Sequence, residues 1–145
     1  MNRRDFIFNS CAACIGATIT SGIMSSCTSR LVPGKIVENG VTINKDEFKK
    51  SGDGKYHSYV VIRNDNLLFP ICVYRFSDND YSALWMQCAH QGAELNVAGD
   101  RLQCPAHGSE YNNKGEVTNG PAETNLRSFP VIIENGEIFI DLRKK

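Results

Sequence analysis

The chain has 145 residues, which is enough for one domain and short for two. Hydrophobic residues make up 41% and charged residues 22%, so the composition is that of a globular protein and excludes wholesale disorder. Sixteen basic and sixteen acidic residues cancel, which excludes the basic excess typical of nucleic-acid-binding proteins. Six cysteines are too few for a disulfide scaffold, and the sequence predicts no internal repeat.

The first 27 residues have the composition of an export signal or a membrane anchor. No charged residue occurs between Asp5 and Arg30, and most residues there are small or apolar. Arg3, Arg4 and Phe6 resemble the twin-arginine export motif. The sequence IMSSC that ends this segment resembles a bacterial lipobox, which predicts a lipoprotein with its lipid on Cys27.

Two alternatives remain for this segment. Residues 6–24 could stay as an uncleaved membrane helix, since a span needs roughly 20 apolar residues, or the chain could be secreted without an anchor. All three interpretations place the domain outside the cytoplasm, and two of them tether it to the periplasmic side of a membrane. We therefore expect a signal peptide or anchor over residues 1–27, a tether over residues 28–34 and a domain over residues 35–145.

After residue 34, the sequence contains β signals and one short helical signal over residues 45–50. Apolar runs rich in β-branched and aromatic residues alternate with turn residues, which predicts an all-β sandwich or barrel. Tight turns are predicted at Asn39-Gly40 and Asn135-Gly136, and Cys72 is expected to be a buried thiol. The expected strands cover residues 35–43, 59–63, 67–76, 81–87, 101–104, 126–133 and 137–142.

Two segments carry cysteine and histidine at the spacing of metal ligands. Cys88 and His90 are separated by one residue, and Cys104 and His107 by two. Two thiolates and two imidazoles can bind zinc tetrahedrally, or they can hold a two-iron cluster with the thiolates on one iron and the imidazoles on the other. The four residues alone leave both chemistries open.

The residues around these four resemble the two cluster-binding loops of the Rieske iron–sulfur proteins, such as the soluble domain of the cytochrome bc complex subunits. The resemblance covers roughly residues 81–131, and residues 120–122 are similar to the proline loop of the family. It implies a small fold of stacked antiparallel sheets with two cluster-binding loops, and a Rieske-type 2Fe-2S cluster. The implied ligands are Cys88, His90, Cys104 and His107, and the other matching residues are Gly92, Pro105, Gly108, Ser109 and Tyr111.

The resemblance also implies roles for two hydroxyl groups. Ser109 would donate a hydrogen bond to a bridging sulfide, and Tyr111 would donate one to the sulfur of Cys88. Donors aimed at the sulfurs favour the reduced state, so both residues would raise the reduction potential as hydrogen-bond donors behind the ligands.

Three positions depart from the quinol-oxidising members of the family. Those proteins join their two loops by a disulfide, and the corresponding positions here are Ala93 and Ala106. Gln91 follows the first histidine, where the family has an apolar residue. We therefore expect a centre that is not of the cytochrome bc type, with a fairly high potential that comes from Ser109 and Tyr111.

These features favour one-electron transfer through a Rieske cluster on the outer side of the cytoplasmic membrane. The redox partners would be proteins, such as a cytochrome or a quinol-oxidising complex, and no catalytic residues are assigned to the domain alone. The alternative is the small subunit of an exported oxidoreductase, of the quinol-oxidising or arsenite-oxidase type. A zinc-stabilised binding module is the remote alternative.

Overall fold

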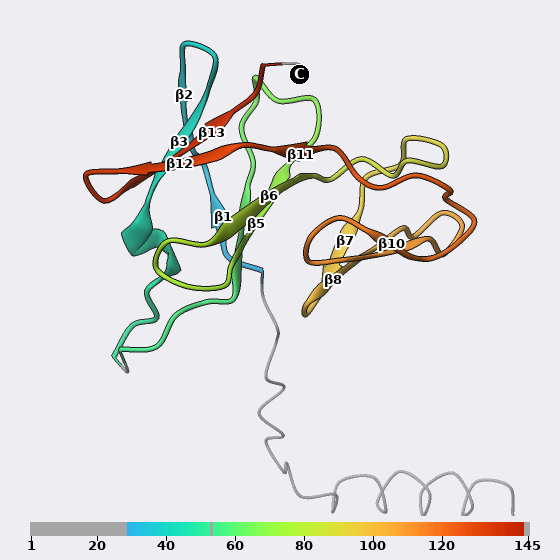
Figure 1. The fold of residues 1–145 in the computed structure, drawn as a ribbon, viewed down its shortest axis with the longest axis horizontal. Coiled ribbons are helices and arrows are strands. Elements are labelled where there is room, and N and C mark those ends of the chain that lie inside the picture. Colours follow the sequence, from blue (N-terminus) through green and yellow to red (C-terminus); the bar gives the residue numbers. More distant parts are fainter. Residues whose placement is uncertain (1–28, 53, 144–145) are drawn as a thin grey trace, which may run out of the picture.

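The computed structural model describes residues 29–52 and 54–143, which form three β-sheets and one short 3-10 helix (Figure 1). The central sheet has the strand order β1 (Leu31–Val32), β4 (Tyr59–Ile62), β5 (Ile71–Arg75), β6 (Tyr81–Trp85) and β11 (Ser128–Phe129). The outer sheet has the order β12 (Val131–Glu134), β13 (Glu137–Asp141), β3 (Gly40–Asn44) and β2 (Lys35–Val37). The small sheet has the order β10 (Val117–Asn119), β9 (Glu110–Asn112), β8 (Arg101–Gln103) and β7 (Asn96–Ala98).

The central sheet is the middle layer of this arrangement. Figure 1 shows the strands of the outer sheet on one side of it and the small sheet on the other. All pairs are antiparallel except β1 and β4, which are parallel. The predicted all-β fold of stacked sheets is therefore confirmed.

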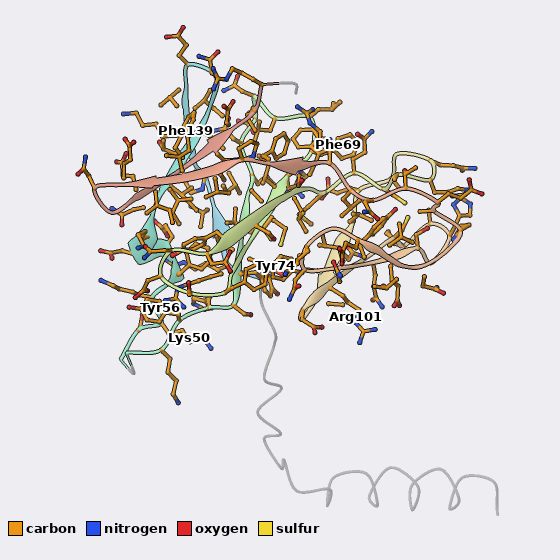
Figure 2. All side chains as sticks on the ribbon, in the orientation of Figure 1. Lys50, Tyr56, Phe69, Tyr74, Arg101 and Phe139 are labelled. Atoms are coloured by element: carbon orange, nitrogen blue, oxygen red, sulfur yellow. The ribbon has the colours of Figure 1, made fainter. Side chains whose placement is uncertain are left out.

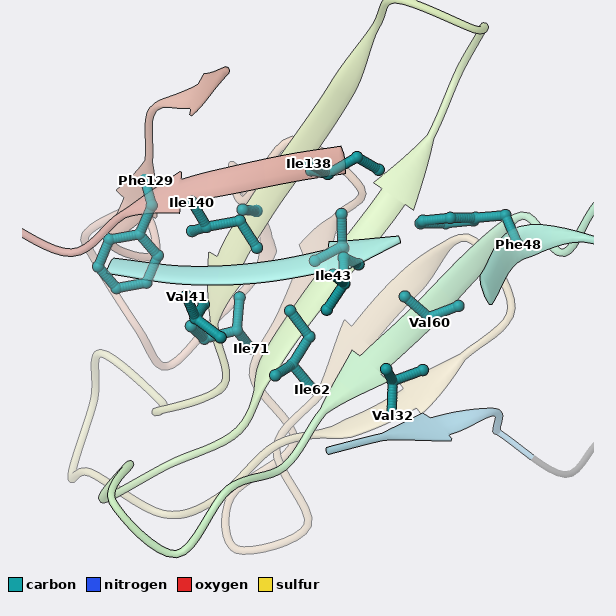
Figure 3. Close-up of a cluster of buried hydrophobic side chains, with 12 residues drawn as sticks. Val32, Val41, Ile43, Phe48, Val60, Ile62, Ile71, Phe129, Ile138 and Ile140 are labelled. Carbon is teal, nitrogen blue, oxygen red and sulfur yellow. The ribbon is translucent and has the colours of Figure 1, made fainter. Parts of the chain in front are cut away.

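Side chains on β4 and β5 are buried on both faces of the central sheet, which explains why these segments are continuously apolar. Successive residues of a strand point to opposite faces, so Ile62 packs toward the outer sheet while Val61 packs toward the small sheet. Figure 3 shows the buried side chains between the central and outer sheets. The second buried group lies between the central and small sheets and contains Val61, Cys72, Tyr74, Leu84, Met86, Cys88, Leu95, Leu102, Cys104, Tyr111, Ala122 and Leu126.

Prolines shorten two of the predicted strands. β5 begins at Ile71 rather than residue 67, because residues 63–70 form a loop that ends at Pro70 and leaves Leu68 84% exposed. The predicted strand over residues 126–133 is divided at Pro130, which has no N–H to continue a ladder. Its first part, β11, pairs with β6 of the central sheet, and its second part, β12, pairs with β13 of the outer sheet.

One of the two predicted turns is confirmed, whereas the other turn and the N-terminal boundary differ from the prediction. The turn at Asn135-Gly136 is confirmed, with φ of 50° and 82°, as a two-residue hairpin requires. The earlier turn is one residue before the predicted place, because β2 and β3 pair Val37 with Gly40. Two residues of the expected tether form β1, where Val32 is buried, so the folded part begins before residue 35.

Short polar strands were missed, whereas the helical signal was correct. β9 and β10 consist largely of polar residues, and β7 is only three residues long, so none of them has a clear alternating pattern. The 3-10 helix η1 (Lys45–Phe48) lies within residues 45–50 as predicted. The Asn44 side chain accepts a hydrogen bond from the Asp46 amide at its start, and Phe48 is buried at its end.

The export signal or anchor over residues 1–27 lies outside the described residues. The same holds for the twin-arginine pair, the lipidation site Cys27 and the alternative helix over residues 6–24. Within residues 29–52 and 54–143, no helix is long and apolar enough to cross a membrane.

We expect Ile62→Ala to lower the free energy of unfolding by about 2–5 kcal/mol, because Ile62 is fully buried and truncation leaves a cavity. Chemical denaturation of the two proteins measures this difference. Leu68→Ala is the control, because its side chain is exposed and its loss should change the free energy by less than about 0.5 kcal/mol. Equal effects of the two substitutions would contradict this packing.

Candidate metal centre

Two loops bring the four candidate ligands together. The first loop, residues 88–93, lies between β6 of the central sheet and β7 of the small sheet. The second loop, residues 104–109, joins the neighbouring strands β8 and β9 within the small sheet. Both loops are therefore held by the small sheet, on the side of the central sheet away from the outer sheet (Figure 1).

The two loops close with the same backbone hydrogen bonds. In the first loop, the Cys88 amide donates to the Ala93 carbonyl at 2.8 Å, and the Gly92 amide donates to the Cys88 carbonyl at 2.9 Å. In the second loop, the bonds from Cys104 to the Ser109 carbonyl and from Gly108 to the Cys104 carbonyl are 2.8 and 3.0 Å long. The loops are thus two copies of one turn, sixteen residues apart.

Within these turns the candidate ligands form two pairs. Cys88 and Cys104 are 3% and 4% exposed and belong to the buried group between the central and small sheets. His90 and His107 are exposed, and their ring centroids lie 5.0 Å apart with the rings nearly perpendicular. The structure therefore brings the four predicted residues into two pairs, one of buried thiols and one of exposed imidazoles.

The surroundings of Cys88 stabilise a thiolate. Burial alone raises the pKa of this thiol, but hydrogen-bond donors around the sulfur outweigh burial and lower the pKa below its ordinary value. These donors are the Tyr111 hydroxyl, the backbone amides of His90 and Gln91, and the thiol of Cys104. Metals bind the thiolate form, so this environment suits a metal ligand.

Tyr111 lies where the resemblance implied. Its side chain is fully buried, and its hydroxyl oxygen lies 3.4 Å from the Cys88 sulfur. The hydroxyl oxygen accepts a hydrogen bond from the Ala89 amide at 3.1 Å, which leaves its proton for the sulfur. Burial, followed by the Cys88 sulfur, raises the pKa of Tyr111 to about 12, so the hydroxyl keeps its proton at neutral pH.

Ser109 is also fully buried and ties the proline segment to the second loop. Its hydroxyl oxygen accepts a hydrogen bond from the Ala122 amide at 3.0 Å, and its proton remains available to a second acceptor. Asn119 adds a hydrogen bond from its side-chain amide to the Gly108 carbonyl at 3.1 Å. Between these contacts lies the cis peptide bond from Gly120 to Pro121.

Cys72 is a buried thiol of a different kind. It is fully buried in β5, as predicted, and burial raises its pKa, so the thiol stays protonated. The three cysteines of the described residues, Cys72, Cys88 and Cys104, form no disulfide. The positions of the family's additional disulfide hold Ala93, which is half-buried, and Ala106, which is exposed.

The four residues fit a two-iron cluster, because they form a pair of sulfurs and a pair of imidazoles. In a Rieske centre, one iron takes two cysteines and the other takes two histidines. Within the described residues, the structure holds no group of three or more His, Cys, Asp or Glu side chains that could bind a metal ion as they stand, so the fit rests on the two pairs. The Ser109 hydroxyl is buried beside these pairs and still has a proton to donate.

Two such loops on a small all-β fold are typical of iron–sulfur electron-transfer proteins. The family model of the Rieske [2Fe-2S] domain matches residues 37–130, which is more than half of the chain. The chain therefore belongs to this family, whose cofactor is a Rieske-type 2Fe-2S cluster. A comparison with curated proteins finds no match.

Solved structures share this fold. The plasma membrane Rieske protein PetC3 from Synechocystis PCC 6803 aligns with a TM-score of 0.50 and 23% identity, covering 58% of this chain and 86% of its own. The ferredoxin of carbazole 1,9a-dioxygenase from Nocardioides aromaticivorans IC177 aligns with a TM-score of 0.50 and 20% identity, covering 70% of this chain and 95% of its own. Both likenesses support the stacked-sheet architecture.

Two residues beside the first loop were missed as contributors to the site. Trp85 and Gln87 were expected only as part of the strand over residues 81–87, but the Trp85 indole N–H donates to the Gln87 side-chain oxygen at 3.1 Å. The signal was a short internal repeat, QCAHQGAE and QCPAHGSE, at residues 87–94 and 103–110. The prediction of a sequence without an internal repeat was therefore wrong.

We expect Tyr111→Phe to lower the reduction potential, because it removes the hydroxyl beside the Cys88 sulfur and leaves the ring. Ser109→Ala should act in the same direction. Redox titration followed by optical or electron paramagnetic resonance spectroscopy measures both shifts. Tyr59→Phe is the control, because the Tyr59 hydroxyl contacts the Ser29 hydroxyl instead. Unchanged potentials in both site variants would contradict these roles.

Proposed function

We propose that this chain transfers single electrons through a Rieske cluster held by Cys88 and Cys104 on one iron and by His90 and His107 on the other. The observation that carries this proposal is the pairing of two buried sulfurs with two exposed imidazoles 5.0 Å apart. A Rieske cluster supplies a one-electron couple whose potential depends on the hydrogen bonds to its sulfurs.

The chain's own residues give this site a buried side and an open side. Tyr111 and Ser109 are fully buried on the cysteine side, where they place hydroxyl donors and exclude water. His90 and His107 are exposed on the other side, together with Ala106. The imidazole edges are therefore the surface through which a redox partner protein would exchange electrons with the centre.

The N-terminal sequence supports a position on the outer side of the cytoplasmic membrane. Arg3, Arg4 and Phe6 fit the twin-arginine route, which exports proteins already folded, often with their cofactor. Lipidation of Cys27 would then hold the domain at the membrane surface. The folded domain begins at most a few residues later, since the Ser29 hydroxyl already contacts the Tyr59 hydroxyl at 3.2 Å.

The first experiment measures metal content and the spectrum of the full chain purified without oxygen. Two irons, acid-labile sulfide and a rhombic Rieske-type signal after reduction with dithionite are the expected result. One zinc per chain without a signal would overturn the proposal and favour a zinc-stabilised module.

We expect His107→Cys and Cys104→Ser each to abolish the native spectrum, because each removes a proposed ligand. His57→Ala and Cys72→Ala are matched controls. Cys72 is a buried thiol whose raised pKa keeps it protonated, and the His57 amide hydrogen-bonds the Phe48 carbonyl away from the loops. Retention of the wild-type spectrum by either ligand variant would refute the assignment.

Purification from membranes separates a free carrier from a subunit of an exported oxidoreductase. A carrier should elute alone from a detergent extract, whereas a subunit should elute with a large partner at constant ratio. Cys27→Ala should release the protein from the membrane fraction if the lipid is its anchor. Continued membrane binding of that variant would instead favour an uncleaved helix.

A further inference from the structure

Each loop of the centre is flanked by the same two polar residues. Gln87 and Glu94 lie at the base of the first loop, where they form an isolated antiparallel bridge. Gln103 and Glu110 lie at the base of the second loop, where they are paired in the β8–β9 ladder. These four residues occupy equivalent places in the internal repeat, but their side chains make different contacts.

At the second loop, the Gln103 side chain contacts Glu110, which lies opposite it on the neighbouring strand. The Gln103 side-chain amide donates to the Glu110 carboxylate at 2.7 Å, and Arg101 lies 3.3 Å from the same carboxylate. A Cβ built on Gly108 would have no atom within 4 Å apart from those of Gly108 and its two chain neighbours. The Gln103 side chain therefore hydrogen-bonds the Glu110 carboxylate and does not lie against Gly108.

At the first loop, the glutamine is turned toward the loop itself. The Glu94 carboxylate forms an ion pair with Arg63, and the Gln87 carboxamide hydrogen-bonds Trp85 instead. The Gln87 side-chain oxygen accepts a hydrogen bond from the Trp85 indole N–H. Because the indole only donates, this contact identifies the oxygen and so the position of the NH₂ group. A Cβ built on Gly92 would lie 3.2 Å from this nitrogen, so the NH₂ group lies directly against the loop.

Trp85 is itself held firmly, so the orientation of Gln87 is well defined. The Trp85 ring packs edge-on against Phe69 and Phe129, with centroid distances of 5.8 Å in both cases. Figure 2 labels Phe69 in the loop before β5. Arg127 covers Phe129, with its guanidinium carbon 4.6 Å from the ring centroid. The Gln87 carboxamide is therefore oriented by an indole that is itself packed between two aromatic rings.

We propose that Gln87 is a positioning residue for the first loop and that Trp85 fixes the direction of its carboxamide. The NH₂ group supports Gly92, and through the turn it supports the Cys88 and His90 side chains. It also directs the positive end of the amide dipole toward the centre, which favours the reduced state. This inference rests on the proposed ligands and adds a residue that the resemblance does not assign.

The test compares Gln87→Leu with Gln103→Leu in the full chain. Gln87→Leu removes the NH₂ group and should shift the ratio of reduced to oxidised protein at a fixed potential by at least threefold, which is about 28 mV toward lower potential at 59 mV per tenfold change. Gln103→Leu is the matched control and should leave the midpoint and the resonance spectrum unchanged, because its amide contacts Glu110.

Two further variants separate positioning from general destabilisation. Trp85→Phe keeps an aromatic ring between Phe69 and Phe129 but removes the indole donor, so the midpoint should fall in the same direction by a smaller amount. Gln87→Glu keeps the shape but replaces the NH₂ group by a carboxylate oxygen. It should not rescue the wild-type midpoint, because it adds negative charge.

Hydrogen exchange of the cluster-free full chain provides a readout that does not depend on iron. The Gly92 amide donates to the Cys88 carbonyl, so Gln87→Leu should accelerate its exchange by more than roughly threefold while leaving Gly108 unchanged. Equal midpoints and exchange rates in Gln87→Leu and wild type would overturn this inference. A wild-type chain without a Rieske signal would overturn the proposed ligands instead, and the exchange rates would still decide the role of Gln87.

Discussion

The geometry of the site depends on one constraint, the sharp reversal of the chain within each loop. Gly92 and Gly108 have φ of 77° and 80°, a region that strains other residues, and each donates its amide to the carbonyl of the cysteine four residues earlier. This closure directs the cysteine into the core and leaves the histidine at the surface. Burial of the sulfurs and exposure of the imidazoles therefore follow from the same backbone turn.

The two loops have the same backbone hydrogen bonds, but they connect different pairs of strands. The second loop joins adjacent strands of the small sheet, whereas the first connects that sheet to the central sheet. Cys88 and Cys104 pack in the same buried group as Cys72 and Leu84 of the central sheet. The core that stabilises the small sheet is therefore also one wall of the site.

The sequence was most informative where interactions are local. Each half of the ligand motif lies within four residues of sequence, and the turn at Asn135-Gly136 consists of adjacent residues. The central strands were recognised because both of their faces are buried and their sequences are therefore continuously apolar. The break at Pro130 was missed because the division between two sheets depends on distant partners. The contact of Gln87 with the first loop was missed for a similar reason, since the direction of its carboxamide is set by Trp85 and the aromatic rings that pack around it.

Charge is arranged at the bases of the loops and is absent from their tips. Residues 88–93 and 104–109 contain no Asp, Glu, Lys or Arg. The carboxylates that follow, Glu94 and Glu110, are paired with Arg63 and Arg101. Because both carboxylates at the loop bases have a positive neighbour, the dipoles of the Tyr111 hydroxyl and the Gln87 amide contribute to the local electrostatic potential without opposition from Glu94 or Glu110. The reduced state of the site carries one more negative charge. Hydrogen-bond donors stabilise that charge, and no unpaired carboxylate at the loop bases repels it, so the surroundings favour reduction.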